Sequence, residues 1–231
     1  MLGLGLGLGA ILLAVIAALA GNSPPHDTPR GARTRVHAVL FRILLGAGCA
    51  CGSVSALRVL VGGTTPVLRL GAAWPAGPWI FGVDALSAVF LLLIFVVGAA
   101  TACYGFTYLA PHAKDEASEP AQPGAASEHA LIALLLVSLA VAVVARAVIP
   151  FIIAWEIMAV TAYFLIVFDA VDPAVRRAGL LYLITTHTGT LVLFVLFAAW
   201  ASRAADLSFA SLAAVAPQLP LGGAAVLSRA L

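Results

Sequence analysis

Two residues inside long apolar stretches have side chains that can take up and release a proton. Glu156 lies in Phe-Ile-Ile-Ala-Trp-Glu-Ile-Met, and His187 lies in Thr-Thr-His-Thr-Gly-Thr. A carboxyl in apolar surroundings favours its neutral form unless a cation lies nearby, and histidine changes its charge within the physiological pH range. These residues therefore predict proton exchange within a membrane. The alternative for both is plain hydrogen bonding between helices.

The positions of Glu156 and His187 within their apolar stretches place them at similar depth. Glu156 follows Pro150 by six residues, a rise of about 9 Å, and His187 lies about 13 Å into the next stretch. If the two stretches are consecutive antiparallel helices, the two residues lie within about 7 Å of each other along the membrane normal. The hydroxyls of Thr186 and Thr190 are then expected to order water molecules between them.

The composition indicates where these stretches reside. Of the 231 residues 63% are apolar and 10% are charged, and the mean hydropathy is +1.10. A globular domain carries about 25% charged residues, so the surface of this chain must face lipid. We expect an all-α membrane protein of about six transmembrane helices. The net charge of +2 gives no indication of nucleic-acid binding.

The hydropathy pattern divides the chain into four parts. Residues 1–62 hold two transmembrane helices, 63–82 an interfacial loop or hairpin, 83–201 helices three to six, and 202–231 an interfacial tail. Loops are predicted at 21–35, 111–128 and 169–177, and a short amphipathic helix at 207–212. A signal peptide ending at residues 18–20 is the alternative for the first helix, but no Lys or Arg precedes that apolar run.

Loop charges predict the orientation. With the N-terminus outside, the inner loops hold six Lys and Arg residues and the outer loops three. This count favours an N-terminus outside, and we expect a multi-pass protein of the cell inner (plasma) membrane. Two further charged residues have supporting roles. Asp84 opens the third helix and is expected to cap it. Arg146 separates the fourth and fifth helices, either as an interfacial anchor or as a charge near Glu156.

Four segments together carry a resemblance to a known family. They are Phe-Gly-Val-Asp-Ala-Leu-Ser-Ala-Val-Phe from residue 81, Trp-Glu-Ile-Met from 155 followed by Tyr-Phe-Leu from 163, Arg-Ala-Gly-Leu-Leu-Tyr-Leu from 177, and Thr-His-Thr-Gly-Thr from 186. Over residues 80–212 this set resembles the antiporter-like subunits of complex I, of Mrp antiporters and of membrane-bound group 4 hydrogenases. The His-x-Gly form is most similar to the third subunit of formate hydrogenlyase and its counterpart in hydrogenase-4.

The resemblance implies roles for the two candidate residues. Glu156 corresponds to the proton-bearing acid of helix five, and His187 to a polar relay position on helix six. Electron transfer would occur in partner membrane subunits of a hydrogenase or NADH:quinone oxidoreductase-like complex, and this chain would need no cofactor of its own. The family pairs its acid with a lysine on helix seven. Since the only lysine here is Lys114, in a predicted loop, we expect the N-terminal part of a longer subunit, with the tail ending before helix seven.

Two other functions remain open at this point. One is an Mrp-type cation/proton antiporter subunit, and the other is a membrane scaffold that transports nothing.

Overall fold

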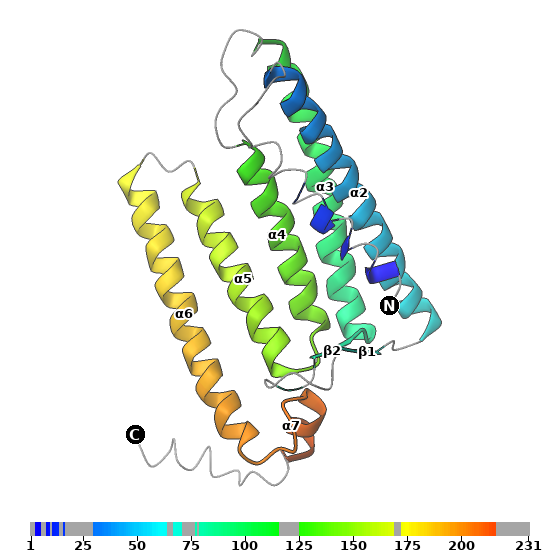
Figure 1. Ribbon diagram of the computed structural model, residues 1–231, viewed down its shortest axis with the longest axis vertical. Helices are drawn as coiled ribbons and strands as arrows, with labels where there is room; N and C mark the ends of the chain where they lie inside the picture. Colours follow the sequence, from blue (N-terminus) through cyan, green and yellow to red (C-terminus); the bar gives the residue numbers. More distant parts are fainter. Residues whose placement is uncertain are drawn as a thin grey trace.

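The computed structural model describes residues 30–63, 67–70, 77, 79–115, 125–168 and 172–215, together with residues 3–5, 8–9, 11–13 and 16. These residues are mainly helical, which confirms the predicted all-α class (Figure 1). The long helices are α2 (Arg30–Gly62), α3 (Ala85–Asp115), α4 (Ala125–Val144), α5 (Val148–Val167) and α6 (Pro173–Ala201), followed by the short α7 (Phe209–Val215). An antiparallel hairpin of β1 (Val67–Leu70) and β2 (Trp79–Gly82) connects α2 to α3.

The long helices pack in sequence order. Helix α2 packs on α3, α3 on α4, α4 on α5 and α5 on α6, and Figure 1 shows α6 at the edge of this bundle. By length and apolar composition, residues Val39–Gly62 of α2, all of α5 and all of α6 are able to cross a membrane. The apolar stretches of α3 and α4, Ala85–Thr101 and Glu128–Val144, are shorter. Large aliphatic side chains of α6 such as Leu191 and Val195 are exposed, as a lipid-facing surface requires.

The main apolar core lies between α2, α3 and α4. Phe95 of α3 is fully buried there, and a Cβ added to Gly52 of α2 would overlap its ring. Likewise, a Cβ on Gly98 of α3 would lie 2.9 Å from Sγ of Cys49, which is also fully buried. Glycine at these two positions therefore lets the helices approach closely, and this part of the bundle forms a tightly packed block.

Several helices extend beyond the apolar spans predicted from the sequence. Helix α2 begins at Arg30, inside the predicted loop 21–35, and α3 continues to Asp115, inside the predicted loop 111–128. Helix α6 begins at Pro173 because Oδ1 of Asp172 accepts a hydrogen bond from the backbone N of Ala174 at 2.8 Å, with proline in the first turn. Hydropathy reports where a helix meets lipid, whereas capping decides where it ends.

Three predicted features lie outside the described residues: the cleavage site at 18–20, the centre of the loop at 116–124 and the tail from residue 216.

Candidate functional site

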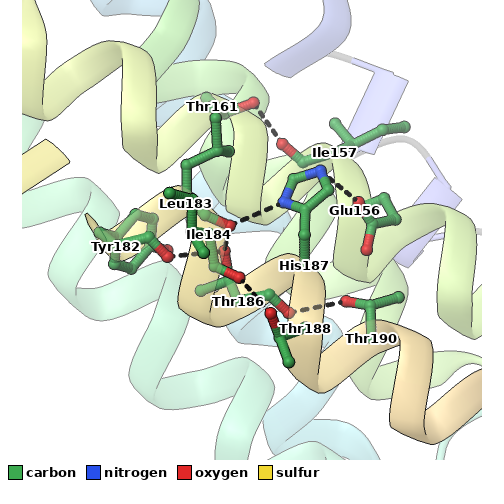
Figure 2. A network of polar contacts seen from close by, with 10 residues as sticks. All are labelled: Glu156, Ile157, Thr161, Tyr182, Leu183, Ile184, Thr186, His187, Thr188 and Thr190. Carbon is green, nitrogen blue, oxygen red and sulfur yellow. Dashed lines mark hydrogen bonds and ion pairs between the residues drawn. The ribbon is translucent and has the colours of Figure 1, made fainter. Parts of the chain in front are cut away.

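The two proton-carrying residues predicted from the sequence are in direct contact between α5 and α6. Nε2 of His187 lies 3.2 Å from Oε2 of Glu156 (Figure 2). The Glu156 side chain keeps 29% of its surface exposed and the His187 side chain 45%. Counting helical rise placed the residues at similar depth, and the packing of α5 on α6 adds the lateral approach that no count along the chain could supply.

The remaining polar atoms of this pair differ in their surroundings. Nδ1 of His187 lies 3.0 Å from the carbonyl oxygen of Leu183, one turn earlier on α6. Oε1 of Glu156 is buried and has no hydrogen-bond partner among the described residues. An unpartnered buried carboxyl oxygen is costly, so this oxygen can still accept a hydrogen bond from a donor.

The threonines around His187 bond to their own helix. The Thr186 hydroxyl lies 3.0 Å from the carbonyl oxygens of both Tyr182 and Leu183, and Thr190 donates to the carbonyl of Thr186 at 3.1 Å. Thr188 makes the same type of bond one turn back, to the carbonyl of Ile184 (Figure 2). Thr185 bonds likewise to the carbonyl of Leu181. The hydroxyl protons are therefore used within α6, and only oxygen lone pairs remain for the water molecules that the sequence led us to expect.

Aromatic rings hold α5 and α6 together near the start of α5. Phe151 of α5 contacts Phe197 of α6 and Phe209 of α7, with ring centroids 6.3 and 5.9 Å apart, and Phe197 stacks on Phe209. Edge-to-face and stacked rings of this kind stabilise beyond their apolar burial. The cluster fixes the lateral position of the helix that carries Glu156.

A second group of charged and polar residues, the Arg146 cluster of Asp84, Ser87 and Arg146, lies where α4 ends and α5 begins. The guanidinium of Arg146 lies 2.9 Å from Oδ2 of Asp84 and donates to the Ser87 hydroxyl at 3.1 Å. That hydroxyl donates to the carbonyl of Val143, and the Ser87 backbone N donates to Oδ1 of Asp84 at 2.8 Å. Asp84 thus caps α3. Arg146 pairs with Asp84 and lies ten residues before Glu156, just ahead of the start of α5, rather than beside it.

The backbone around Arg146 explains why the helix breaks there. Pro150 has no N–H to donate to the carbonyl of Arg146, and this carbonyl instead accepts from the backbone N of Phe209 at 3.0 Å. The Arg146 N–H donates to the carbonyl of Ile80 in β2 at 2.8 Å. Residues 145–147 therefore form an extended link, bridged to β2 at Phe81 and to the segment before α7 at Ser208.

Hydrogen bonds outside the spanning segments shift two carboxyl pKa values. The backbone N–H of Ser87, followed by its side chain and Arg146, holds the pKa of Asp84 below its ordinary value against the opposing effect of burial. The Ser208 hydroxyl, which donates to Oδ1 of Asp206 at 2.6 Å, lowers the pKa of Asp206.

Sequence reasoning missed Ser87, Asp206 and Ser208. The sequence pattern that could have identified them is an aspartate followed by a serine at a helix start, three residues later for Asp84 and two residues later for Asp206.

Comparison with known proteins gives two kinds of match. No family model matches the chain. Proteins described as uncharacterised in two strains of Mycobacterium tuberculosis are 27% identical over 176 residues, which is 74% of this chain. The chain spans 25%, about a quarter, of the length of these curated relatives.

Two solved structures resemble the fold. A chain of the membrane-bound sulfane sulfur reductase, an archaeal respiratory membrane complex, superposes with a TM-score of 0.68 over 92% of this chain and 40% of its own, at 17% identity. A chain of the Mrp complex from Dietzia sp. DQ12-45-1b gives a TM-score of 0.59 over 88% and 36%, at 16% identity.

These matches show the fold. The chain is a membrane-embedded helical protein with the antiporter-like fold that the sequence motifs led us to expect. The hydrogenase-4 branch and the residue roles stay predictions.

Proposed function

We propose that this chain is a proton-translocating membrane subunit in which Glu156 holds the proton and His187 exchanges it. The observation that carries the proposal is the 3.2 Å contact between the Glu156 carboxyl and the His187 imidazole, between two helices apolar enough to span a membrane. Ionisable side chains within membranes commonly mark proton or ion pathways. The fold shared with membrane subunits of a respiratory complex and of the Mrp complex supports the same function.

The pair suits proton exchange because its total charge does not change during the transfer. A proton on Oε2 of Glu156 gives two neutral groups, and the same proton on Nε2 of His187 gives a carboxylate beside an imidazolium. Neither state places a lone charge in the bilayer, where an isolated charge costs several kcal/mol or more. Glu156 can thus be charged or neutral without leaving an unpaired charge in the bilayer, as a proton carrier requires.

The wider setting follows from the motifs. The His-x-Gly sequence around His187 supports assembly with other membrane subunits of a hydrogenase-4-like or NADH:quinone oxidoreductase-like complex. In this proposal the partners carry the electron-transfer cofactors, and the chain lies in the inner membrane with its N-terminus outside. The Arg146 cluster fixes the start of α5, so that Glu156 keeps its place opposite His187.

The test replaces Glu156 by glutamine in the complete subunit, in its membrane assembly. Glutamine keeps the shape of the side chain and cannot carry the proton, so we expect proton uptake by membrane vesicles to be lost while the assembly stays intact. The matched control is Glu128→Gln, since Glu128 is an exposed glutamate in the first turn of α4. Unchanged uptake in Glu156→Gln would contradict the proposal and favour a scaffold that transports nothing.

Cation/proton exchange is the second candidate, favoured by the structural similarity to the Mrp complex. In the same vesicles, proton movement that requires a sodium or potassium gradient would support exchange. Proton movement that is independent of both cations would support the first candidate.

A further inference from the structure

We infer that His187 receives and returns its proton through a single ring nitrogen, Nε2, because the Leu183 carbonyl keeps Nδ1 protonated. This inference rests on the proposed function for its place in transport. The assignment of the protons within the ring rests on the contacts alone.

The argument begins with the Leu183 carbonyl. A carbonyl oxygen accepts hydrogen bonds and cannot donate, so the 3.0 Å contact requires a proton on Nδ1 of His187. A neutral imidazole carries one ring proton. When His187 is neutral, its proton is therefore on Nδ1, and Nε2 presents a lone pair to Glu156.

The contact with Glu156 then requires a proton between the two side chains. In one state the Oε2–H bond of Glu156 is intact and this hydroxyl donates to Nε2. When the O–H bond breaks and an Nε2–H bond forms, the electron pair stays on the carboxylate and His187 becomes an imidazolium. Both states hold the same number of protons. Removing the shared proton would leave two lone pairs facing each other across 3.2 Å, so the contact requires a proton on either Oε2 of Glu156 or Nε2 of His187.

A relay through the ring is blocked on the Nδ1 side. Such a relay would pass the Nδ1 proton to another group, but the Leu183 carbonyl cannot take a proton, and the Thr186 hydroxyl is directed at the same oxygen. The proton must leave from Nε2, which requires rotation of the side chain away from Glu156. The 45% exposure of that side chain gives it room to move.

Neighbouring titratable groups do not replace either partner. Residues 130–144 of α4, which packs against α5, include no ionisable side chain. The other titratable group of α5, Tyr163, lies about two turns beyond Glu156, and its ring contacts Phe164. On α6, Tyr182 precedes His187 by more than one turn, and Arg176 and Arg177 are about three turns away.

Solid-state NMR of the full chain in lipid bilayers, with ¹⁵N-labelled histidine, tests the assignment directly. The His187 signals are identified by their loss in His187→Gln. In the neutral state we expect a protonated, pyrrole-type resonance for Nδ1 and an unprotonated, pyridine-type resonance for Nε2. In Glu156→Gln the amide N–H donates to Nε2, so the same tautomer should persist. A neutral ring protonated at Nε2 would overturn the inference.

A histidine methylated at Nε2, incorporated at position 187, tests the consequence for transport. The methyl group blocks the nitrogen that faces Glu156, so proton uptake should fall to the level of Glu156→Gln. Continued uptake with this analogue, with the assembly intact, would show that Nε2 is not required and would overturn the single-nitrogen mechanism. Continued uptake in Glu156→Gln would overturn the proposed function while leaving the NMR assignment standing.

Discussion

Two acid–base pairs in the described part of the chain differ in their surroundings. The charged groups of Asp84 and Arg146 lie 2.9 Å apart at the end of the bundle, and Ser87 hydrogen-bonds to both residues. In addition, the backbone N–H of Arg146 donates to the carbonyl of Ile80, and its carbonyl accepts from the N–H of Phe209. Glu156 and His187 meet at 3.2 Å between α5 and α6, with one carboxyl oxygen left unpartnered among the described residues.

The difference indicates which pair is built to change. Arginine stays charged at any physiological pH, and each bond in the Arg146 cluster restricts the next, so that pair is a fixed connection. Histidine titrates, and a single contact is easily released. Many bonds around a charged pair thus favour a structural role, and few bonds around a titratable one favour exchange.

The largest expected effect on stability is that of Arg146→Ala. The change removes the bonds to Asp84 and Ser87, so Oδ2 of Asp84 and Oγ of Ser87 each lose a hydrogen-bond donor. Hydrogen bonds to charged groups contribute about 2 kcal/mol, so we expect a loss of about that size in the free energy of unfolding. Denaturation in mixed micelles measures it, with the exposed Arg203→Ala as control. Equal stability of the two variants would show that the cluster is dispensable.

Ser87→Ala should have a smaller effect. It removes the hydroxyl that donates to the Val143 carbonyl and accepts from Arg146. The backbone N–H of Ser87 still donates to Oδ1 of Asp84, so the helix cap remains. The lost neutral hydrogen bond to Val143 contributes about 1 kcal/mol, and Arg146 keeps its ion pair with Asp84 after losing the Ser87 acceptor, so we expect a destabilisation of about 1 kcal/mol in the same denaturation assay. A loss as large as that of Arg146→Ala would place the serine, rather than the ion pair, at the centre of the cluster.

Acid should weaken the Arg146 cluster. The pKa of Asp84 is lower in the folded chain than in the unfolded chain, so its stabilising contribution is complete above the unfolded pKa and disappears as the pH falls through the folded pKa. Unfolding measured between neutral and strongly acidic pH should show this decline. The decline should be reduced in Asp84→Asn, and an identical pH profile in that variant would refute the assignment. Asp206, whose pKa is lowered too, contributes equally to both profiles.

Glu156→Gln should change stability least. The amide group donates to Nε2 of His187 in place of the proton, and hydrogen bonds between membrane helices contribute only about 0.6 kcal/mol on average. We expect a change within about 0.5 kcal/mol in the unfolding assay, together with the loss of proton uptake proposed above. Destabilisation comparable to that of Arg146→Ala would remove the distinction between the two pairs.

The sequence predicted some of these features and could not predict others. Hydropathy was sufficient for the all-α membrane class, because lipid contact imposes a composition that few other environments allow. The cap formed by Asp84 is local and could be expected from its position at a helix start. The partner of Arg146 lies about 60 residues away in the chain and depends on how α3 and α4 meet, so spacing left two interpretations open.

The same limit applies to the candidate site. Helical rise gave the relative depth of Glu156 and His187 but not their rotation about the helix axes, and therefore not their contact. The bonds of Thr186 and Thr190 to carbonyls of their own helix were not anticipated, although threonine in a helix commonly makes them.

These threonine bonds have a consequence for the way the chain enters the bilayer. Because the hydroxyls from Thr185 to Thr190 find acceptors within α6, the helix requires no neighbour to satisfy them during insertion. Nε2 of His187 and Oε2 of Glu156 instead meet across two consecutive helices, which leave the ribosome one after the other. If α5 and α6 insert together as one hairpin, each of these side chains supplies the hydrogen-bond partner that the other needs. The site would then form while the protein is being inserted into the membrane.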